Sequence, residues 1–382
     1  MSRRRTRAVI GICAVVTVVA LLLGACGGSP AAPSPTVAPA QPAAKPAAQP
    51  AASAHSAAKP ITLVFSEFEA PGSFWDTKIA KPYFAEIDKR TNGRVKIEAH
   101  FGGELASLFE VYEAVSKGTV DMAKILPTMD ASKFPVDGMG IFNPVNAKTY
   151  RPNRAWLDFY NEFPEAKTQY KYSPLLGYAI MPCSGLATVK NKTITKWEDA
   201  KGLKAPGAGP AAESRLKAIG IVPVSINPPD IYMAAKNGML DVVAVGLISL
   251  RDFKWGEVLP NVTLVNINNS PWSYVMSAKA WNSLPPDIQQ VFIDLVPWLT
   301  DLSDRVQYEN EQTALKEFGK EFGTNFIKLS QAELDRWAVV DGPTLDAYIK
   351  ENITAKGMPG DKMKSEFLRL YQKYGAEEYA FK

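Results

Sequence analysis

The residue types that carry out most enzyme chemistry are scarce in this chain. Its 382 residues contain two histidines, His55 and His100, and three cysteines, Cys13, Cys26 and Cys183. Cysteine catalysis needs a base beside the thiolate, and zinc sites need several histidines and cysteines together. Only His100 and Cys183 lie where the sequence has the pattern of a folded protein. Zinc and Cys–His chemistry are therefore excluded.

Cys183, within the segment AIMPCSGL, is most simply a small, half-buried side chain. A pair of carboxylates could still serve a lipid-anchored hydrolase or transferase, but no motif indicates one. We therefore expect no catalytic residue, no metal site and no cofactor. The sequence favours a binding protein, with the hydrolase or transferase as the alternative.

The first 25 residues have the composition of an export signal. Four arginines precede an apolar run from Ala8 to Leu23, and two small residues then lead to Cys26. This order is typical of a secretory signal, and the run is short for a membrane span. The segment Leu23–Cys26 resembles the lipobox of bacterial lipoproteins, in which the cysteine is fatty-acylated, as with palmitate. The resemblance implies an anchored lipoprotein, whereas the alternative is a cleaved signal with an incidental cysteine.

Residues 26–60 are nearly all Ala, Pro, Ser and Gln, and such a segment buries too little apolar area to fold. We expect a disordered tether, with His55 as a solvated residue within it. The four signal arginines, Lys45 and Lys59 all precede residue 61, so the formal charge of +4 becomes −2 for the rest of the chain. A nearly neutral protein argues against nucleic acid or another polyanionic partner.

From residue 61 onward, strand-like segments alternate with helical ones. The segments ITLVFSEF, RVKIEAH and TVDMAKIL favour strands, and the order returns later with VPVSI and MLDVVAVGL. Strands separated by helices of this length indicate βαβ units on a parallel sheet, and therefore the α/β class. Roughly 320 residues exceed what one core usually holds, so we expect two lobes.

The sequence contains the same helix–turn–strand pattern, called the corner below, at two places. KGTVDM at 117–122 and NGMLDV at 237–242 each follow a helical stretch. The pattern predicts a helix that ends at Gly118 or Gly238, where glycine supplies positive φ. The chain would then enter a central strand through Asp121 or Asp241, and two such lobes would enclose a cleft. Chance recurrence in an α/β protein is the alternative.

Several segments resemble, in order, the solute-binding proteins of tripartite ATP-independent periplasmic (TRAP) transporters, the DctP-like family. They are residues 91–123, KFPV at 133–136, and residues 190–204, 218–243 and 279–295. The resemblance implies a two-lobed, periplasmic-binding-protein-like fold of the TRAP type (type II) that closes over a small organic molecule. It also implies docking on integral-membrane subunits driven by a sodium or proton gradient.

The resemblance implies strands that cross between the lobes near residues 183–190 and 270–278. A long helix would run along both lobes over residues 285–323, and Pro297 should kink or break it. We expect one lobe from residues 61–185 plus 272–300. The other would comprise residues 186–271 plus 301–382, including C-terminal packing helices. We expect a monomer.

The departures from the family are concentrated where relatives bind their ligand. Most relatives carry a carboxylate-clamping arginine two residues after the lysine that corresponds to Lys204. Here that lysine is followed by Ala-Pro. A second arginine commonly found on the preceding strand is missing, and the stretch after Asp241 is apolar. The resemblance places the ligand positions at Cys183, Ser184, Ala205, Val243 and Val245.

A buried carboxylate without a partner costs about 2–5 kcal/mol. The missing arginines could be replaced by Lys204, Lys124, Arg251 or the free N–H groups of a helix start after Pro210. Lys204 and Arg251 could equally be solvated surface charges. We predict an apolar cleft for a neutral or largely apolar solute. Five aromatic residues could provide stacking faces or belong to the core: Phe68, Trp75, Phe142, Trp255 and Trp272.

Two other functions remain compatible with such a fold. A binding protein for an ATP-driven importer shares the architecture, although the order of the segments favours the TRAP type. A sensor or scavenger could have kept the fold without a transporter. In each case we expect an exported protein, anchored to the outer face of the cytoplasmic membrane or in the periplasm.

Overall fold

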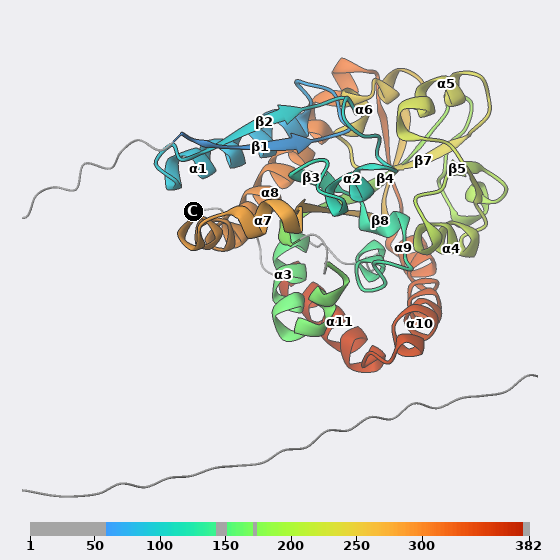
Figure 1. Ribbon diagram of the computed structural model, residues 1–382. Helices are drawn as coiled ribbons and strands as arrows, with labels where there is room; N and C mark the ends of the chain where they lie inside the picture. The colour runs from blue at the N-terminus through green and yellow to red at the C-terminus, as the bar shows by residue number, and fades with distance from the viewer. Residues whose placement is uncertain (1–58, 143–150, 171–173, 377–382) are drawn as a thin grey trace, which may run out of the picture. The chain divides into compact units, whose positions relative to one another are not determined.

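The computed structural model describes residues 59–142, 151–170 and 174–376 (Figure 1). The described residues all belong to one compact unit, Ala57–Lys382. The predicted signal peptide, Cys26 and all but the end of the predicted tether lie outside the described residues. Within the part that is described, no helix combines the length and the apolar composition needed to cross a membrane.

A mixed seven-stranded sheet runs through the compact unit. Its order is β2-β1-β3-β8-β4-β7, with β9 paired to β8, while β5 and β6 form a separate parallel pair. The strands are β1 (Ile61–Ser66), β2 (Val95–His100), β3 (Met122–Ile125), β4 (Leu175–Thr188), β5 (Lys204–Pro206), β6 (Val222–Val224), β7 (Val242–Val245), β8 (Asn261–Met276) and β9 (Asn325–Lys328). β1 is parallel to β2 and β3, as the predicted βαβ units require. The antiparallel pairs all involve β4 or β8.

Eleven α-helices surround these strands in the described residues. They are α1 (Lys81–Arg90), α2 (Val111–Ser116), α3 (Pro152–Glu162), α4 (Pro210–Ala218), α5 (Ile231–Lys236), α6 (Ser249–Asp252), α7 (Ala278–Ser283), α8 (Pro286–Glu321), α9 (Gln331–Ala338), α10 (Asp341–Asn352) and α11 (Gly360–Ala376). Shorter helical turns are η1 (Trp75–Ala80), η2 (Pro127–Met129), η3 (Asp137–Ile141), η4 (Pro164–Tyr170), η5 (Trp197–Ala200), η6 (Pro228–Asp230), η7 (Trp255–Glu257) and η8 (Thr354–Lys356). α9, α10 and α11 confirm the predicted C-terminal helices.

Helices cover both faces of the sheet in the first lobe. Successive strand residues point to opposite faces, and here both sets are buried. Met122 and Tyr274 pack in a cluster with side chains of α1 and α8, whereas Ala123 and Val275 pack with α2, α3 and α11. This burial on both faces explains why the strands read as continuous apolar runs rather than as alternating ones.

The repeated corner has the same hydrogen bonds in both lobes. Gly118 and Gly238 have φ values of 69° and 72°. Thr119 N donates to Ala114 O at 2.9 Å and Met239 N donates to Ala234 O at 2.8 Å. These are the bonds of a Schellman motif, in which the αL residue is usually glycine. The predicted glycine-terminated helix is confirmed twice.

Each corner then fixes its aspartate against a neighbouring strand. Val64 N donates to Asp121 Oδ2 at 2.9 Å, and Lys204 N donates to Asp241 Oδ2 at 3.0 Å. The backbone N–H of each aspartate donates in return to the carbonyl oxygen of Val64 or Lys204. The recurrence therefore reflects one local structure used in both lobes.

The two longest strands, β4 and β8, belong to both lobes. β8 pairs with β3 at residues 273–276 and with β9 at 261–264, while β4 pairs with β7 at 185–188. Between these regions, residues 179–183 pair with residues 268–272 and with no other described strand. The link is a two-stranded antiparallel ribbon. On β4, this ribbon (residues 179–183) lies just before the crossing predicted at residues 183–190. On β8, the ribbon (residues 268–272) begins just before the crossing predicted at residues 270–278.

The long helix α8 contains 36 residues and packs on α1 in one lobe and on β9 in the other. Pro297 lies inside it, so of the predicted kink or break, the break does not occur. A helical proline removes one backbone hydrogen bond and crowds the preceding turn. Leu295 and Leu299, on either side of Pro297, are fully buried in a core cluster, and this packing holds the helix together.

Two buried aspartates tie α3 to its neighbours. Asp304 of α8 accepts hydrogen bonds from the backbone N–H groups of Asn153 and Arg154, at 3.0 and 3.1 Å, and so caps the start of α3. Asp137 accepts from Tyr160 Oη at 2.9 Å and from the Gln169 amide. Burial raises the pKa of each aspartate to about 7. The hydrogen bonds to each carboxylate lower its pKa, but their effect is smaller than that of burial.

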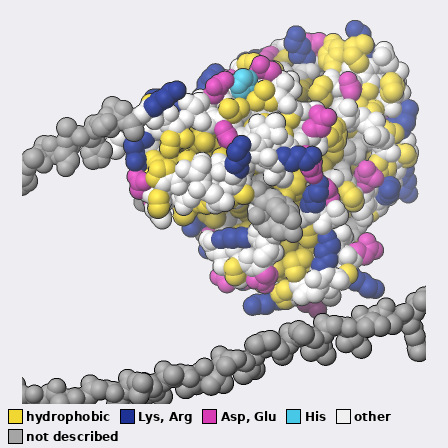
Figure 2. All heavy atoms as spheres, in the orientation of Figure 1, with side chains coloured by type: hydrophobic (Ala, Val, Ile, Leu, Met, Phe, Trp, Pro, Cys, Tyr) yellow, Lys and Arg dark blue, Asp and Glu magenta, His cyan; other side chains and the backbone are white. Residues whose placement is uncertain are grey.

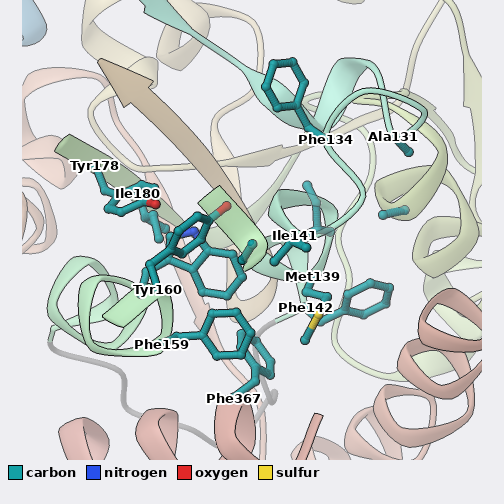
Figure 3. Packing of buried hydrophobic residues seen from close by; sticks show 14 of the residues in the cluster. Ala131, Phe134, Met139, Ile141, Phe142, Phe159, Tyr160, Tyr178, Ile180 and Phe367 are labelled. Atoms are coloured by element: carbon teal, nitrogen blue, oxygen red, sulfur yellow. The ribbon is translucent and has the colours of Figure 1, made fainter. Parts of the chain in front are cut away.

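Figure 3 shows part of a cluster of buried hydrophobic residues to which α3 contributes. Phe159 and Tyr160 of α3 lie beside Phe367 of α11 and Tyr178 of β4. On the face of the molecule shown in Figure 2, basic and acidic side chains are interspersed, in line with the small charge calculated for the chain after residue 60.

Candidate functional site

A cavity of about 140 Å³ lies between the two lobes. Its walls come from the segments that follow β1 and β3 in the first lobe and β5, β6 and β7 in the second, together with the middle of β4 and β8. The carboxyl ends of strands in open α/β sheets are the usual place for ligands. The volume is close to that of the engineered cavity of about 150 Å³ that binds benzene in another protein.

The lobes touch each other beside this cavity. Gly209, which precedes α4, has a φ of 91°, and a Cβ placed on it would lie 2.2 Å from the carbonyl oxygen of Thr128 in η2. Only a glycine permits that approach and that backbone conformation. The loop before α4 therefore packs directly on the first lobe.

One wall of the cavity is an aromatic box around a buried ammonium. Lys124 Nζ lies 4.0 Å from the ring centre of Trp75, 4.5 Å from that of Trp272 and 5.5 Å from that of Phe68. These distances are within the range of cation–π attraction. The three rings line the cavity, while Lys124 itself is fully buried behind them.

Two carboxyl groups share that ammonium. Lys124 Nζ lies 2.6 Å from Glu69 Oε2 and 3.2 Å from Glu67 Oε1, and the exposed fractions of the three side chains are 0–3%. Burial, followed by the neighbouring Glu69, raises the pKa of Glu67 well above its usual range, although Lys124 opposes the shift. The positive charge of Lys124 is thus already neutralised within the protein.

The remaining lining is almost free of charge. Among the described residues that line the cavity, Glu69 is the only one with a charged side chain, and none is Lys, Arg or His. Arg215 of α4 is buried and adjoins the lining residue Leu216 in the sequence. Its guanidinium, however, pairs with Asp341 of α10 and lies 5.8 Å from the ring centre of Phe142. The described cavity wall therefore offers no cationic side chain to a ligand.

Residues 168–352 match a family model described as bacterial extracellular solute-binding protein, family 7, or DctP. The C4-dicarboxylate-binding periplasmic protein DctP of Rhodobacter capsulatus is 24% identical over 299 residues, covering 77% of this chain and 88% of that protein. Residues 168–352 are thus similar to the DctP family, and the periplasmic relative is similar over most of the chain.

Solved structures of TRAP solute-binding proteins have the same fold. One, from a marine metagenome and specific for aromatic acid ligands, was crystallised with 3-hydroxybenzoate. It has a TM-score of 0.76 and 20% identity, covering 83% of this chain and 99% of that one. Another, from Bordetella bronchiseptica with bound mandelate, has a TM-score of 0.74 and 22% identity, covering 82% and 99%. The predicted α/β, two-lobed architecture is confirmed.

Six of the residues that the sequence predicted as ligand contacts line the cavity. They are Phe68, Trp75, Cys183, Val243, Trp255 and Trp272. Cys183 Sγ lies 3.6 Å from Ser270 Oγ, and burial raises the pKa of the thiol to about 11. A thiol that stays protonated at neutral pH fits the prediction of a small packing side chain.

Two of the proposed replacements for the DctP-family arginine lie outside the cavity. Lys204 Nζ donates to the carbonyl oxygen of Gly238 at 3.2 Å in an exposed position. Arg251 forms ion pairs with Glu317 and Glu321 of α8. The third candidate, Lys124, adjoins the cavity but has two carboxyl partners. The start of α4, the fourth, borders the cavity through Ala208 and Ala212.

Four other predicted contacts also lie elsewhere. Phe142 is in the cluster shown in Figure 3, where its ring centre is 5.5 Å from that of Tyr348. Ala205 and Val245 are buried in two separate cores of the second lobe. Ser184 lines a different, small cavity of about 20 Å³. For Ser184 and Ala205 this follows the alternation of side chains along a strand, because the neighbouring Cys183 and Pro206 line the cavity instead.

The structure adds residues that sequence reasoning missed. Glu69, Asn268 and Asn269 all line the cavity. Asn268 and Asn269 are adjacent and buried in β8. Adjacent amides inside a buried strand could have indicated a binding function. His100 is on β2 outside the lining. Its hydrogen bonds with Glu104 and Glu98 raise its pKa.

Proposed function

We propose that this chain is an extracytoplasmic solute-binding protein that captures a small organic molecule between its lobes and delivers it to a TRAP-type secondary transporter. The cavity at the carboxyl ends of strands from both lobes carries this proposal. Binding by lobe closure removes a ligand from water and presents a changed surface to a partner. The match to the DctP family supports the same function.

The ligand in this proposal is neutral or largely apolar. Relatives of the same fold are described with 3-hydroxybenzoate and mandelate, so a single ring suits the shared architecture. In this chain, however, the ammonium nearest to the cavity already faces two carboxyl groups. A ligand carboxylate would enter beside Glu69 without a cation of its own. Two like charges about 4 Å apart repel by about 4 kcal/mol at an effective dielectric constant near 20.

The proposal extends to location and assembly. The protein would be exported, acylated at Cys26 and held outside the cytoplasmic membrane by the tether to residue 60. It would act as a monomer with TRAP integral-membrane subunits as partners. The lobes would comprise residues 61–185 plus 272–300 and residues 186–271 plus 301–382, although α11 of the second group packs on α3 of the first. The pairing of β8 residues 273–276 with β3 supports the first grouping.

Mass spectrometry of the small molecules released by denaturing the purified full-length protein tests this function. We expect one uncharged organic molecule in stoichiometric amount. Calorimetric titration with benzoate, malonate and uncharged analogues should then give tighter binding for the uncharged compounds. Tight binding of a simple mono- or dicarboxylate would overturn the ligand class. Absence of any bound or bindable small molecule would overturn the solute-binding function itself.

A further inference from the structure

One hydrogen bond connects the two lobes beside the cavity. The backbone N–H of Phe74, between β1 and η1, donates to Oδ2 of Asp252, the last residue of α6, at 2.9 Å. The two residues are 178 positions apart and belong to the residue ranges of different lobes. Phe74 is buried, and the next residue, Trp75, lines the cavity and faces Lys124. The bond therefore holds the segment that carries one wall of the cavity.

The short helix α6 is anchored in the second lobe and reaches the first. Leu250 is fully buried in a core cluster with side chains of α5 and β7. Ile248, directly before α6, is buried in the cluster that contains Phe74 and Trp75. Phe253, directly after α6, lines the cavity. A separation of the lobes would therefore withdraw α6 from the first lobe and break its hydrogen bond there.

The hydrogen bond to Asp252 differs from others at the start of η1 in where its acceptor comes from. Asp76 N donates to Ser73 Oγ at 3.3 Å, and Thr77 N donates to Ser73 O at 3.0 Å. Both of these acceptors lie in the same short segment, whereas the acceptor of Phe74 N lies in the other lobe. The first N–H groups of a helix have no partner within it, and its dipole favours a carboxylate there. Asp252 thus acts as a helix cap supplied by the second lobe.

We infer that Asp252 stabilises the closed lobes by capping Phe74 and thereby slows the release of the bound solute. This inference rests on the proposed function and names a residue that controls it from outside the ligand site. Asp252 is not among the described residues that line the cavity, so it is a positioning residue that acts through the wall formed by Trp75. A contact that forms only on closure changes dissociation more than association.

Hydrogen exchange followed by mass spectrometry tests this role without a ligand. In the full-length protein, Asp252→Ala should speed exchange several-fold at residues 72–80, near the capped N–H group. It should also speed exchange at residues 207–212, where Gly209 packs on Thr128. That packing is a separate contact between the lobes, so it responds if the two contacts open together. A change confined to residues 72–80, or no change at all, would overturn the inference.

The release of a small ring compound gives a functional measurement. Benzyl alcohol is a suitable probe, because it is uncharged and has one ring, as in the proposed ligand class. In stopped-flow measurements of tryptophan fluorescence, Asp252→Ala should raise its dissociation rate about tenfold, the effect of losing one hydrogen bond to a charged acceptor. The association rate should change less than twofold. An unchanged dissociation rate, or an equal change in both rates, would overturn the inference.

Two further variants separate this role from general stability. Asp252→Asn keeps an acceptor oxygen for Phe74 N, so it should restore release to within about threefold of the parent rate. Asp199→Ala is the matched control, because Asp199 Oδ2 accepts from Thr195 N at 2.8 Å within the second lobe. It should leave both the release rate and the exchange at residues 207–212 unchanged. Equal effects of Asp199→Ala and Asp252→Ala would indicate lost stability alone and overturn the assignment.

The outcome is separable from that of the proposed function. If benzyl alcohol binds but its release does not depend on Asp252, the inference is wrong and solute binding stands. If neither benzyl alcohol nor a copurified solute binds the parent protein, the proposed function fails. The exchange experiment then still decides whether Asp252 couples the two lobe contacts.

Discussion

Replacing Lys124 with methionine tests the electrostatics of the cavity wall. The Nζ atom lies 2.6 Å from Glu69 and 3.2 Å from Glu67, and all three side chains are buried. At an effective dielectric constant near 20, each contact is worth about 5–6 kcal/mol of attraction before the cost of desolvation. Methionine fills similar space but leaves two buried carboxyl groups without a cation. Removing one partner of a buried ion pair typically costs about 3–5 kcal/mol.

The loss should depend on pH with a definite sign. Burial already raises the pKa of Glu67 in the folded protein, and replacing Lys124 removes the group that opposes this shift. The folded state then binds more protons, so the variant becomes more stable as the pH falls through the folded pKa toward the unfolded value of about 4.3. Urea unfolding at pH 8 and pH 5 should show the full deficit at pH 8 and a smaller one at pH 5.

A matched pair of variants completes the test. Adding Glu67→Gln and Glu69→Gln to Lys124→Met removes the uncompensated charge, so the triple variant should recover most of the lost stability. Lys96→Met, which breaks an exposed pair with Asp88, should cause no measurable change. A Lys124→Met variant as stable as the parent at pH 8, or a triple variant less stable than the single one, would refute the reasoning.

Three further predictions follow from the same structure. Glu69→Gln should strengthen benzoate binding about tenfold or more in calorimetric titration, because it removes the negative charge from the cavity lining. Asp121→Ala and Asp241→Ala should each lower the free energy of unfolding in urea by about 1–3 kcal/mol, and by similar amounts, because each leaves one strand N–H without its acceptor. Asp137 and Asp304, with pKa values raised to about 7, should make the protein less stable as the pH rises from about 4 to 7, by at most about 4 kcal/mol per group, and their asparagine variants should flatten that dependence in denaturant melts.

Each of these three has a control and a contrary outcome. Glu113→Gln, on an exposed side chain outside the cavity, should leave benzoate binding unchanged, and an equal gain there would contradict the role of Glu69. Markedly different losses for the two alanine variants would contradict the equivalence of the corners. Stability that rises between pH 4 and 7 would contradict buried aspartates as the dominant titrating groups.

Local structure was well predicted from the sequence because local bonds create it. The corner at Gly118 and its counterpart at Gly238 involve residues no more than five apart, so a short sequence motif specifies them. The alternation of strands and helices was also predicted, because strands that are buried on both faces appear in the sequence as apolar runs of strand length. The long helix was also predicted, although Pro297 did not end it, since packing on both sides outweighed one lost hydrogen bond.

The ligand site was predicted only in part because its determinants are long-range. Lys124 and Lys204 are both lysines near strand ends, and nothing local distinguishes them. Their difference is that Lys124 meets Glu69, 55 residues away, and Trp272, while Lys204 meets a carbonyl oxygen at the surface. Likewise, Phe142 and Trp272 are similar aromatic candidates until the fold places one in a core and the other on the cavity.

The long strands β4 and β8 also bear on how such a chain can be divided. β4, from the first half of the chain, pairs with β7 of the second half, and β8, from the second half, pairs with β3 of the first. Each half thus completes its sheet with a strand from the other, as in a domain-swapped dimer whose subunits have been joined into one polypeptide. Neither half closes its own sheet, so a fragment cut after β4 would expose the free edge of β3 and associate with a second copy rather than fold alone.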